Sequence, residues 1–401
     1  MYISHISLRN LRCFRHTDCT FRHPDAGDSV GEGSNNVNLI VGGNGAGKTT
    51  LLKAIALAVL TPILRDCGYV SHRMVREGMG LARIKGSLML HEAEADTPFL
   101  SWPTSLEIKR LKGKTARETL DTKTGENYLA AYREDNHPSF FLAGYGATRR
   151  IETGEYNLGA IRRKRWLRYH RVVTLFEDNE ALTPLESWLP QYRSTKRFDE
   201  ILTLINNLLP DGTTLLDEDQ GGDFLFKHNG ITLPLSTLSD GYRAYIAWTT
   251  DLVAHMAACA PDGMPLATMR GVVLVDEVDL HLHPAWQLQI VTHLSKTLPN
   301  LQFIFTSHSP IVAGTFHNPP LVIEAEEDGA MAVHERGETI HGFNVEQILH
   351  SPYFGLRTTR APSKERELVE LLRDAQAGDL NAARRYMARA NETTSLQEPQ
   401  S

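Results

Sequence analysis

Residues 42–50 combine glycines, a lysine and two threonines at the spacing needed to hold a triphosphate. They read Gly-Gly-Asn-Gly-Ala-Gly-Lys-Thr-Thr, which matches the phosphate-loop pattern G-x-x-x-x-G-K-S/T. The glycines let backbone N–H groups turn toward the α and β phosphates. Lys48 is predicted to reach the β and γ phosphates, and the Thr49 hydroxyl to hold Mg²⁺. The predicted nucleotide site is made of Gly42, Gly43, Asn44, Gly45, Ala46, Gly47, Lys48, Thr49 and Thr50.

Two carboxylates follow the apolar run Gly-Val-Val-Leu-Val that begins at Gly271. Such a run predicts a buried strand, and open α/β sheets bind ligands at the carboxyl ends of their strands. We predict that Asp276 holds Mg²⁺. Glu277 is the candidate general base, which would take a proton from the attacking water. Two solvated acids at a strand end are the alternative, which the phosphate loop makes the less favoured one.

Two further segments could complete a phosphate site. The apolar run 301–306 is followed by Ser-His-Ser-Pro, which places His308 where it could donate to a γ-phosphate and orient the water. A purely structural histidine is the alternative. Residues 238–243 read Leu-Ser-Asp-Gly-Tyr-Arg just before a helical pattern, so N–H groups freed at Ser239 and Asp240 could bind a phosphate. A plain helix cap explains that segment equally simply.

The elements that must position these residues are short strands and helices. Alternating runs at 83–90 and 104–111 predict antiparallel strands with one solvated face, in a lobe of about residues 65–135. A mostly helical insert is expected over about residues 150–215. Asp328-Gly329 predicts the turn of a hairpin over residues 322–333. Apolar periodicity predicts strands at 37–41, 271–276 and 301–306 and helices at 51–60, 363–376 and 380–390.

Composition limits the partners and the compartment. The chain has 401 residues and a net charge of −6, so contact with nucleic acid would need a local basic patch. The stretch from Arg162 to Arg171, Arg-Arg-Lys-Arg-Trp-Leu-Arg-Tyr-His-Arg, is such a candidate for binding DNA. A solvated helix face, or ion pairs with the acidic residues 177–180, is the favoured alternative.

The scattered cysteines and the N-terminal sequence point to the cytoplasm. The four cysteines contain no C-x-x-C pair, which suits a reducing compartment. The first residues lack the basic and apolar regions of a signal peptide, and no apolar run is long enough to span a membrane. We therefore expect a cytoplasmic protein without a membrane partner.

The order of the motifs resembles that of ABC-class ATPases. A phosphate loop is followed by a Leu-Ser-x-Gly signature, a strand ending in Asp-Glu, and a histidine after the next strand. Residues 276–284, 306–310 and 10–14 resemble the RecF/SMC/OLD-like branch of bacterial repair and phage-defence systems, which includes the Septu-type ATPases. The resemblance covers about residues 1–360. It implies an α/β phosphate-loop NTPase with an ABC-type head, in which helices flank a mixed central sheet. A C-terminal helical segment (361–391) and a disordered tail (392–401) would follow.

The resemblance also implies how the parts act. Two copies would close head to tail as a homodimer, or a higher even oligomer, with ATP between them. Ser239 and Gly241 of one copy would contact the γ-phosphate held by the other, and residues 281–284 would cross the interface. The expected function is a Mg²⁺-dependent ATPase switch in anti-phage defence or DNA repair, with a separate effector such as a nuclease. A scaffold with negligible turnover and, less favoured, a transporter ATPase are the alternatives.

The sequence departs from the family pattern in two places. No glutamine lies between Lys48 and Gln191, although ABC heads carry a glutamine loop before the signature. The loop from Tyr145 to Arg150 is a candidate replacement, with Arg149 or Arg150 facing the nucleotide. OLD proteins end in a Toprim-type nuclease domain, but the chain after His308 lacks its metal-ligand pattern. We predict no intrinsic nuclease.

Overall fold

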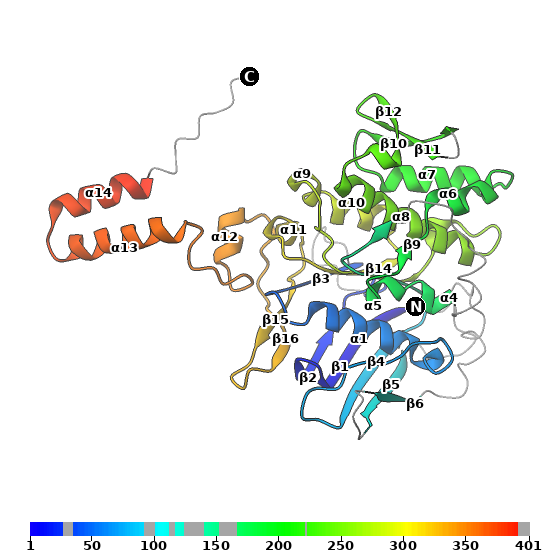
Figure 1. Cartoon of the computed structure of the whole chain (residues 1–401), viewed down its shortest axis with the longest axis horizontal. Helices are drawn as coiled ribbons and strands as arrows, with labels where there is room; N and C mark the ends of the chain where they lie inside the picture. Colours follow the sequence, from blue (N-terminus) through cyan, green and yellow to red (C-terminus); the bar gives the residue numbers. More distant parts are fainter. Residues whose placement is uncertain are drawn as a thin grey trace. The chain divides into compact units, whose positions relative to one another are not determined.

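The computed structural model describes residues 1–26, 35–91, 101–111, 117–123, 140–151, 167–220 and 223–391. Contacts divide the chain into two compact units, Met1–Phe343 and Asn344–Ser401. The sequence places this boundary near residue 360, whereas the contacts place it before Asn344. The larger unit contains all the predicted nucleotide-site residues and is drawn in blue through yellow in Figure 1.

One mixed sheet of eleven strands runs through the larger unit. The order across the sheet is β6-β5-β4-β1-β2-β16-β15-β3-β14-β13-β7, so both edge strands, β6 and β7, come from the first 145 residues of the chain. The strands are β1 (Tyr2–Leu11), β2 (Phe14–Thr20), β3 (Val37–Gly42), β4 (Leu81–Met89), β5 (Ser101–Arg110), β6 (Glu118–Lys123), β7 (Phe141–Tyr145), β13 (Gly271–Val275), β14 (Leu301–Thr306), β15 (Leu321–Ala325) and β16 (Met331–Glu335).

The parallel half of the sheet positions the site. Strands β7, β13, β14, β3 and β15 pair in parallel, and β7, β13 and β14 are buried along their whole length. Their carboxyl ends therefore meet at one edge of the sheet, as expected of ligand-binding α/β sheets. The predicted strands at 37–41, 271–276 and 301–306 are confirmed within one residue. The predicted hairpin at 322–333 is formed by β15 and β16, which together span 321–335.

The antiparallel strands continue this sheet. Strands β2, β1, β4, β5 and β6 pair antiparallel, with apolar side chains buried on one face. Helix α1 (Lys48–Leu60) packs against that buried face, and all its residues from Leu51 to Leu60 except Lys53 are buried. The predicted lobe is thus joined to the core through β1, β2 and β16.

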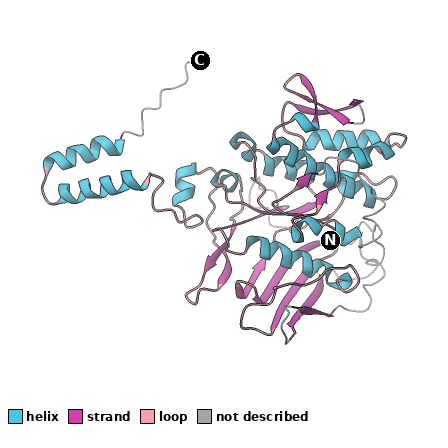
Figure 2. Ribbon diagram, viewed as in Figure 1, coloured by secondary structure: helices cyan, strands magenta, loops and turns pink. Residues whose placement is uncertain are grey.

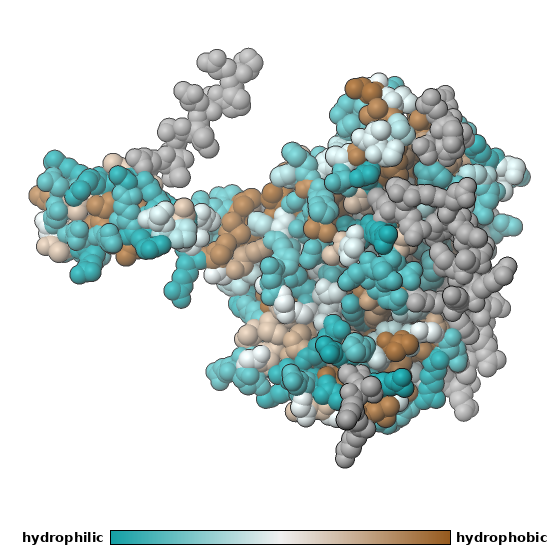
Figure 3. Space-filling model, viewed as in Figure 1, coloured by the Kyte–Doolittle hydropathy of each residue, from teal (hydrophilic) through white to brown (hydrophobic). Residues whose placement is uncertain are grey.

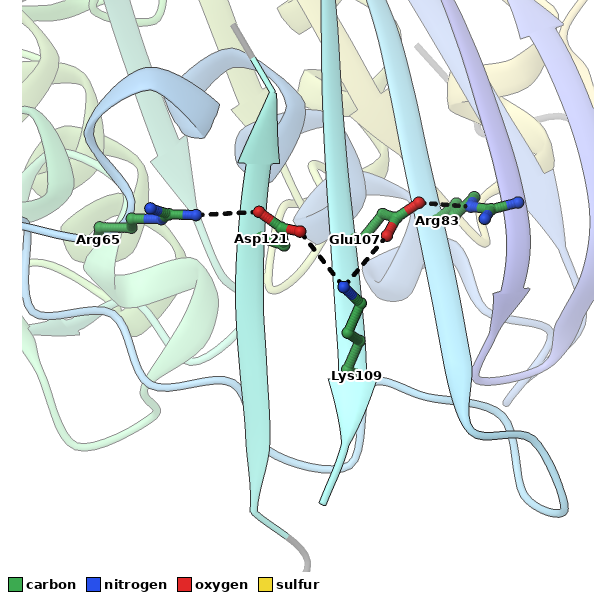
Figure 4. Close-up of polar contacts among 5 residues, drawn as sticks. All are labelled: Arg65, Arg83, Glu107, Lys109 and Asp121. Atoms are coloured by element: carbon green, nitrogen blue, oxygen red, sulfur yellow. Dashed lines mark hydrogen bonds and ion pairs between the residues drawn. The ribbon is translucent and has the colours of Figure 1, made fainter. Parts of the chain in front are cut away.

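Ion pairs line the opposite, solvated face of the antiparallel strands (Figure 4). Lys109 on β5 lies 3.5 Å from Glu107 and 3.3 Å from Asp121 of β6, while Arg83 of β4 binds Glu107 at 2.9 Å. Arg65 extends the series to Asp121 at 3.0 Å. Pairs this exposed contribute little each, so they specify which face meets water more than they stabilise the sheet.

Helices pack on the parallel half, and a small three-stranded sheet, β10-β11-β12, lies beyond them and contacts α6 and α7 (Figures 1 and 2). In the described part of the predicted helical insert, helices α4 to α6 span four residues each. Longer helices are α7 (Phe198–Leu208) and α8 (Asp240–Cys259), which pack together. The other elements are α4 (Leu167–His170), α5 (Val173–Phe176), α6 (Leu185–Trp188), α9 (Pro284–Gln287), α10 (Ile290–Thr297), α11 (Pro310–Gly314), η1 (Thr61–Ile63), η5 (Leu189–Tyr192), η6 (Leu235–Thr237), η7 (Leu266–Thr268), β8 (Arg150–Ile151), β9 (Ala181–Leu182), β10 (Thr213–Gln220), β11 (Asp223–His228) and β12 (Ile231–Pro234).

The described part of the basic stretch is buried. Residues 162–166 lie outside the described residues, but Arg168 is 1% exposed and Arg171 is 3% exposed. The Arg168 guanidinium donates to the Phe140 carbonyl at 2.9 Å and lies over the Phe140 ring, and Arg171 lies over the Phe141 ring. The expectation of a solvated face is therefore wrong for these two arginines. Because they are buried, these two arginines are not available to bind DNA either.

The smaller unit is a set of helices. It contains α12 (Val345–His350), α13 (Pro362–Gln376) and α14 (Leu380–Asn391), and the last two pack as a hairpin. Apolar side chains such as Val369 and Met387 remain exposed on this hairpin, among the charged ones (Figure 3). The predicted tail at 392–401 lies outside the described residues. Among the helices that are described, none combines the length and apolar character needed to cross a bilayer.

Candidate nucleotide site

The phosphate loop connects β3 to α1 and depends on its glycines. Gly45 and Gly47 have φ of 75° and 108°, which side chains rarely tolerate. A Cβ on Gly47 would lie 2.4 Å from Cys13 Sγ, so the loop is held closely against the β1–β2 turn. A Cβ on Gly43 or Gly45 would meet nothing within 4 Å, so the loop presents an open side. This is the cradle that a phosphate chain requires.

Lys48 folds back over this loop. Its Nζ donates to the carbonyls of Gly42 at 2.9 Å and Gly43 at 3.0 Å. Burial lowers the pKa of Lys48, while Asp276 and Glu277 act in the opposite direction. The ammonium group is therefore held by the loop carbonyls and lies within the electrostatic influence of the two carboxylates that follow β13.

Asp276 is clamped between two hydroxyl groups. Its Oδ2 accepts a hydrogen bond from Thr49 Oγ1 at 2.6 Å, and its Oδ1 accepts one from Thr306 Oγ1 at 2.6 Å. The Asp276 residue is 3% exposed. A hydroxyl and a carboxylate in contact beside a phosphate loop are the oxygen ligands that Mg²⁺ takes together with nucleotide phosphates, so these residues fit the ion.

Glu277 and His308 follow the clamp residues Asp276 and Thr306 closely in the chain. Glu277 is partly exposed, and its φ of 48° is unusual for a residue with a side chain. Burial and the nearby Lys48 lower the pKa of His308, and the carboxylates of the site, Glu277 foremost, raise it in part. The charges of the lysine and of the carboxylates thus both act on His308, whose contact with a γ-phosphate remains a prediction.

Arg149 points to the backbone of the acidic pair. Its Nη2 donates to the main-chain carbonyls of Asp276 at 2.5 Å and Glu277 at 2.8 Å. Arg150, the other candidate of this loop, is exposed on β8. The loop after Tyr145 therefore does lie at the site, but the described contacts of Arg149 are with protein carbonyls.

The signature segment begins α8. Ser239 is the exposed N-cap of this helix, and Gly241 packs against the loop that follows Glu277. A Cβ on Gly241 would lie 2.1 Å from the His281 carbonyl oxygen, so only glycine permits this approach. One face of the helix is apolar and packed in the core, with Tyr245, Trp248, Leu252 and Met256 all buried. Ser239 and Gly241 remain predicted phosphate contacts.

Sequence reasoning assigned no role to Thr306. The residue ends β14 and is fully buried, and its hydroxyl also accepts from the Glu277 amide at 2.7 Å. Its only sequence signal is a polar residue at the carboxyl end of an apolar strand next to the acidic one. Arg149 differs from Thr306, because the sequence expected it to face the nucleotide, whereas its described hydrogen bonds are to the carbonyls of Asp276 and Glu277.

The fold and the site together define an SMC-like ATPase head of the ABC type. Residues 37–313 match the family model described as "AAA domain, putative AbiEii toxin, Type IV TA system", and residues 1–60 match one described as "AAA ATPase domain". The first match covers more than half of the chain, so the protein belongs to that AAA-domain family.

Several similar proteins carry names from bacterial defence systems. Septu protein PtuA of Bacillus mycoides (strain KBAB4) is 27% identical over 323 residues, which are 80% of this chain and 41% of that protein. Septu protein PtuA of Bacillus thuringiensis is 25% identical over 81% of this chain and 80% of its own length. Retron Ec83 probable ATPase of Escherichia coli is 33% identical over 35% of this chain. The chain spans 41% of the first relative and 27% of the retron protein.

Solved SMC heads share the fold. A structure of the SMC head bound to the C-terminal winged-helix domain of ScpA aligns with a TM-score of 0.50 at 14% identity, over 84% of this chain and 98% of that chain. An SMC head from Pyrococcus furiosus, bound to the C-terminal domain of ScpA, aligns with a TM-score of 0.50 at 12% identity, over 84% and 96%. At these identities the likeness concerns the fold alone.

Proposed function

We propose that the protein is a cytoplasmic, Mg²⁺-dependent ATPase that acts as a nucleotide-gated dimeric switch and controls a separate effector, such as a nuclease, in anti-phage defence. The contact between Thr49 Oγ1 and Asp276 Oδ2 carries this proposal, because it joins the phosphate loop to the strand-end carboxylate. The Septu and retron names of the similar proteins support the defence role.

Each residue of the site would have its own role in ATP hydrolysis. Lys48 and the loop amides would hold the phosphates, and Thr49 and Asp276 would hold Mg²⁺, which supplies charge neutralisation when bound. The Glu277 carboxylate would accept a proton from water as the water oxygen bonds to the γ-phosphorus and the bond to ADP breaks. His308 would donate to the γ-phosphate. The products are ADP and phosphate.

Closing the nucleotide site would need a second copy of the chain. Ser239 is exposed at the start of α8, where backbone N–H groups of a helix favour an anion. We propose that this end contacts the γ-phosphate bound by the partner subunit. The SMC-like head supports this arrangement by its fold.

Glu277→Gln tests the proposal. The variant should hydrolyse ATP about 10²–10⁴-fold more slowly while still binding it, because only the proton acceptor is lost. With ATP and Mg²⁺, the variant should accumulate as a dimer, which light scattering would detect as a species of twice the 44.9 kDa mass of the chain. Glu327→Gln, at an exposed position on the β15–β16 turn, is the matched control and should behave as wild type.

Two results would contradict the proposal. Wild-type turnover by Glu277→Gln would remove Glu277 as the base. A wild-type rate as low as that of the variant, with ATP still bound, would favour the scaffold alternative over an ATPase switch.

A further inference from the structure

Arg149 carries a buried positive charge that nucleotide binding does not explain. The residue is 5% exposed, and burying a guanidinium is unfavourable unless its N–H groups find acceptors. Burial lowers the pKa of Arg149 to about 10, and the carboxylates of Asp276, Asp279 and Glu277 oppose this effect. The guanidinium group stays charged at neutral pH, so its hydrogen-bond partners indicate its role.

Arg149 holds both peptide groups that flank Glu277. One carbonyl that it binds belongs to the peptide before Glu277, and the other belongs to the peptide after it. The N–H groups of the same two peptides are held by Thr306, since Glu277 N donates to its hydroxyl at 2.7 Å and Val278 N donates to its carbonyl at 3.0 Å. The planes of the two peptides are thus fixed, and with them φ and ψ of Glu277.

The conformation held in this way is one that glutamate does not adopt readily. Glu277 has φ of 48°, in the left-handed region where a Cβ is disfavoured. Such a backbone persists only where the surroundings impose it. Because the backbone sets the direction of the Cα–Cβ bond, Arg149 and Thr306 aim the Glu277 carboxylate.

Arg149 and its loop are anchored to two helices, α8 and α5. Its guanidinium lies 5.9 Å from the centre of the Trp248 ring on α8, within the range of a cation–π contact. Tyr145, which precedes the loop, accepts from Asp276 N at 2.9 Å and donates its hydroxyl to Asp251 of α8 at 3.0 Å. The loop between them starts at Gly146, where a Cβ would lie 2.3 Å from the Thr174 carbonyl oxygen. Helix α8 therefore supports the group that holds Glu277.

We propose that Arg149 is a positioning residue that locks the backbone of Glu277 in its left-handed conformation and so aims the general base. The inference rests on the proposed function, in which Glu277 takes the proton from water. It departs from the sequence expectation, because Arg149 acts through protein carbonyls and leaves ATP binding to the phosphate loop.

Arg149→Ala should separate turnover from binding. Misplacing a catalytic group by about 1 Å costs about 10²-fold, so kcat should fall by about that factor. The dissociation constant of a fluorescent ATP analogue should stay within about threefold of wild type, since no phosphate contact is lost. Arg150→Ala, the exposed neighbour, is the matched control. Arg149→Lys keeps the charge and one donor, and should recover part of kcat.

A readout without nucleotide tests the backbone itself. Amide hydrogen exchange in residues 276–281 should be faster in Arg149→Ala than in wild type or Arg150→Ala, while exchange in α1 stays unchanged. Faster exchange throughout the larger unit would instead mean general destabilisation and would overturn the proposal. If Arg149→Ala fails to fold, Arg149→Lys takes its place in both experiments. Unchanged kcat and exchange in that variant would also overturn it.

The double variant separates this inference from the proposed function. If Arg149 acts through Glu277, Arg149→Ala with Glu277→Gln should hydrolyse ATP no more slowly than Glu277→Gln alone. Multiplied losses would show an independent role for Arg149, and so would loss of ATP binding. Wild-type turnover by Glu277→Gln alone would refute the base assignment, whereas a slow Glu277→Gln beside an unaffected Arg149→Ala would refute only the positioning role.

Discussion

Thr306→Val probes the clamp on Asp276 with a nearly isosteric change. The Thr306 hydroxyl makes two hydrogen bonds, one donated to Asp276 Oδ1 at 2.6 Å and one accepted from Glu277 N at 2.7 Å. Valine fills the same space but offers neither bond. The residue is fully buried, so water cannot replace the lost partners without rearrangement.

The expected loss of stability follows from these two bonds. A hydrogen bond to a charged group contributes about 1.5–3 kcal/mol, and leaving a buried N–H unpaired costs about 1–3 kcal/mol. Allowing for overlap between the two, the free energy of unfolding should fall by about 3–4 kcal/mol. Urea unfolding of the nucleotide-free protein, followed by circular dichroism, measures it as a lower midpoint with an unchanged slope.

Thr249→Val is the matched control. Thr249 is 1% exposed, but its hydroxyl donates only to carbonyls of its own helix, Tyr245 and Ile246. These carbonyls lie inside α8, where helical N–H groups already serve them, so the loss should be about 1 kcal/mol. If Thr306→Val loses no more stability than Thr249→Val, the hydroxyl does not hold the Asp276–Glu277 segment and the reasoning fails.

Two further predictions concern α8. Gly241→Ala should lower both the melting temperature and ATP turnover, because its Cβ would lie 2.1 Å from the His281 carbonyl oxygen. The control variant is Gly337→Ala, which has open space around the new Cβ and should match wild type in both measurements. Burial raises the pKa of Asp251, but His255 and the Thr183 amide lower it to about 2 overall. Since this folded-state pKa is below the unfolded value of about 3.9, the stability from Asp251 is present above about pH 4 and is lost toward pH 2. Acid unfolding of Asp251→Asn should lack this component; the same pH dependence in the variant would contradict the assignment.

Local patterns made the phosphate loop and its strands predictable. The glycines and lysine at 42–48 lie within one turn and one helix start, and an apolar run suffices to define β13 or β14. The contact of Arg149 with the Asp276 carbonyl joins positions 127 residues apart, which no local pattern encodes. No local pattern encodes the continuity of the sheet either, since β16 and β2, which pair within it, lie near opposite ends of the chain.

The basic stretch shows why charge alone misleads. Six arginines and lysines in ten residues predict a surface, yet Arg168 and Arg171 are buried over the rings of Phe140 and Phe141. A guanidinium is weakly hydrated and planar, so an aromatic face and a carbonyl can replace its water. The sequence contains the arginines, but their ring partners Phe140 and Phe141 lie at the start of β7, 28 residues before Arg168 and 30 before Arg171.

Helix α8 contacts the loop that follows the acidic pair and also Tyr145, which binds the Asp276 amide. At its start, Gly241 lies against the His281 carbonyl, which follows Glu277 in the chain. Further along, Asp251 binds the Tyr145 hydroxyl, and the Tyr145 carbonyl in turn accepts from Asp276 N. These two contacts lie on one continuous helix of 20 residues, which offers a direct path from its start to its middle. In the proposed dimer, a γ-phosphate held by the partner subunit would act on that start. Each subunit would therefore sense its partner's nucleotide through the element that holds its own general base.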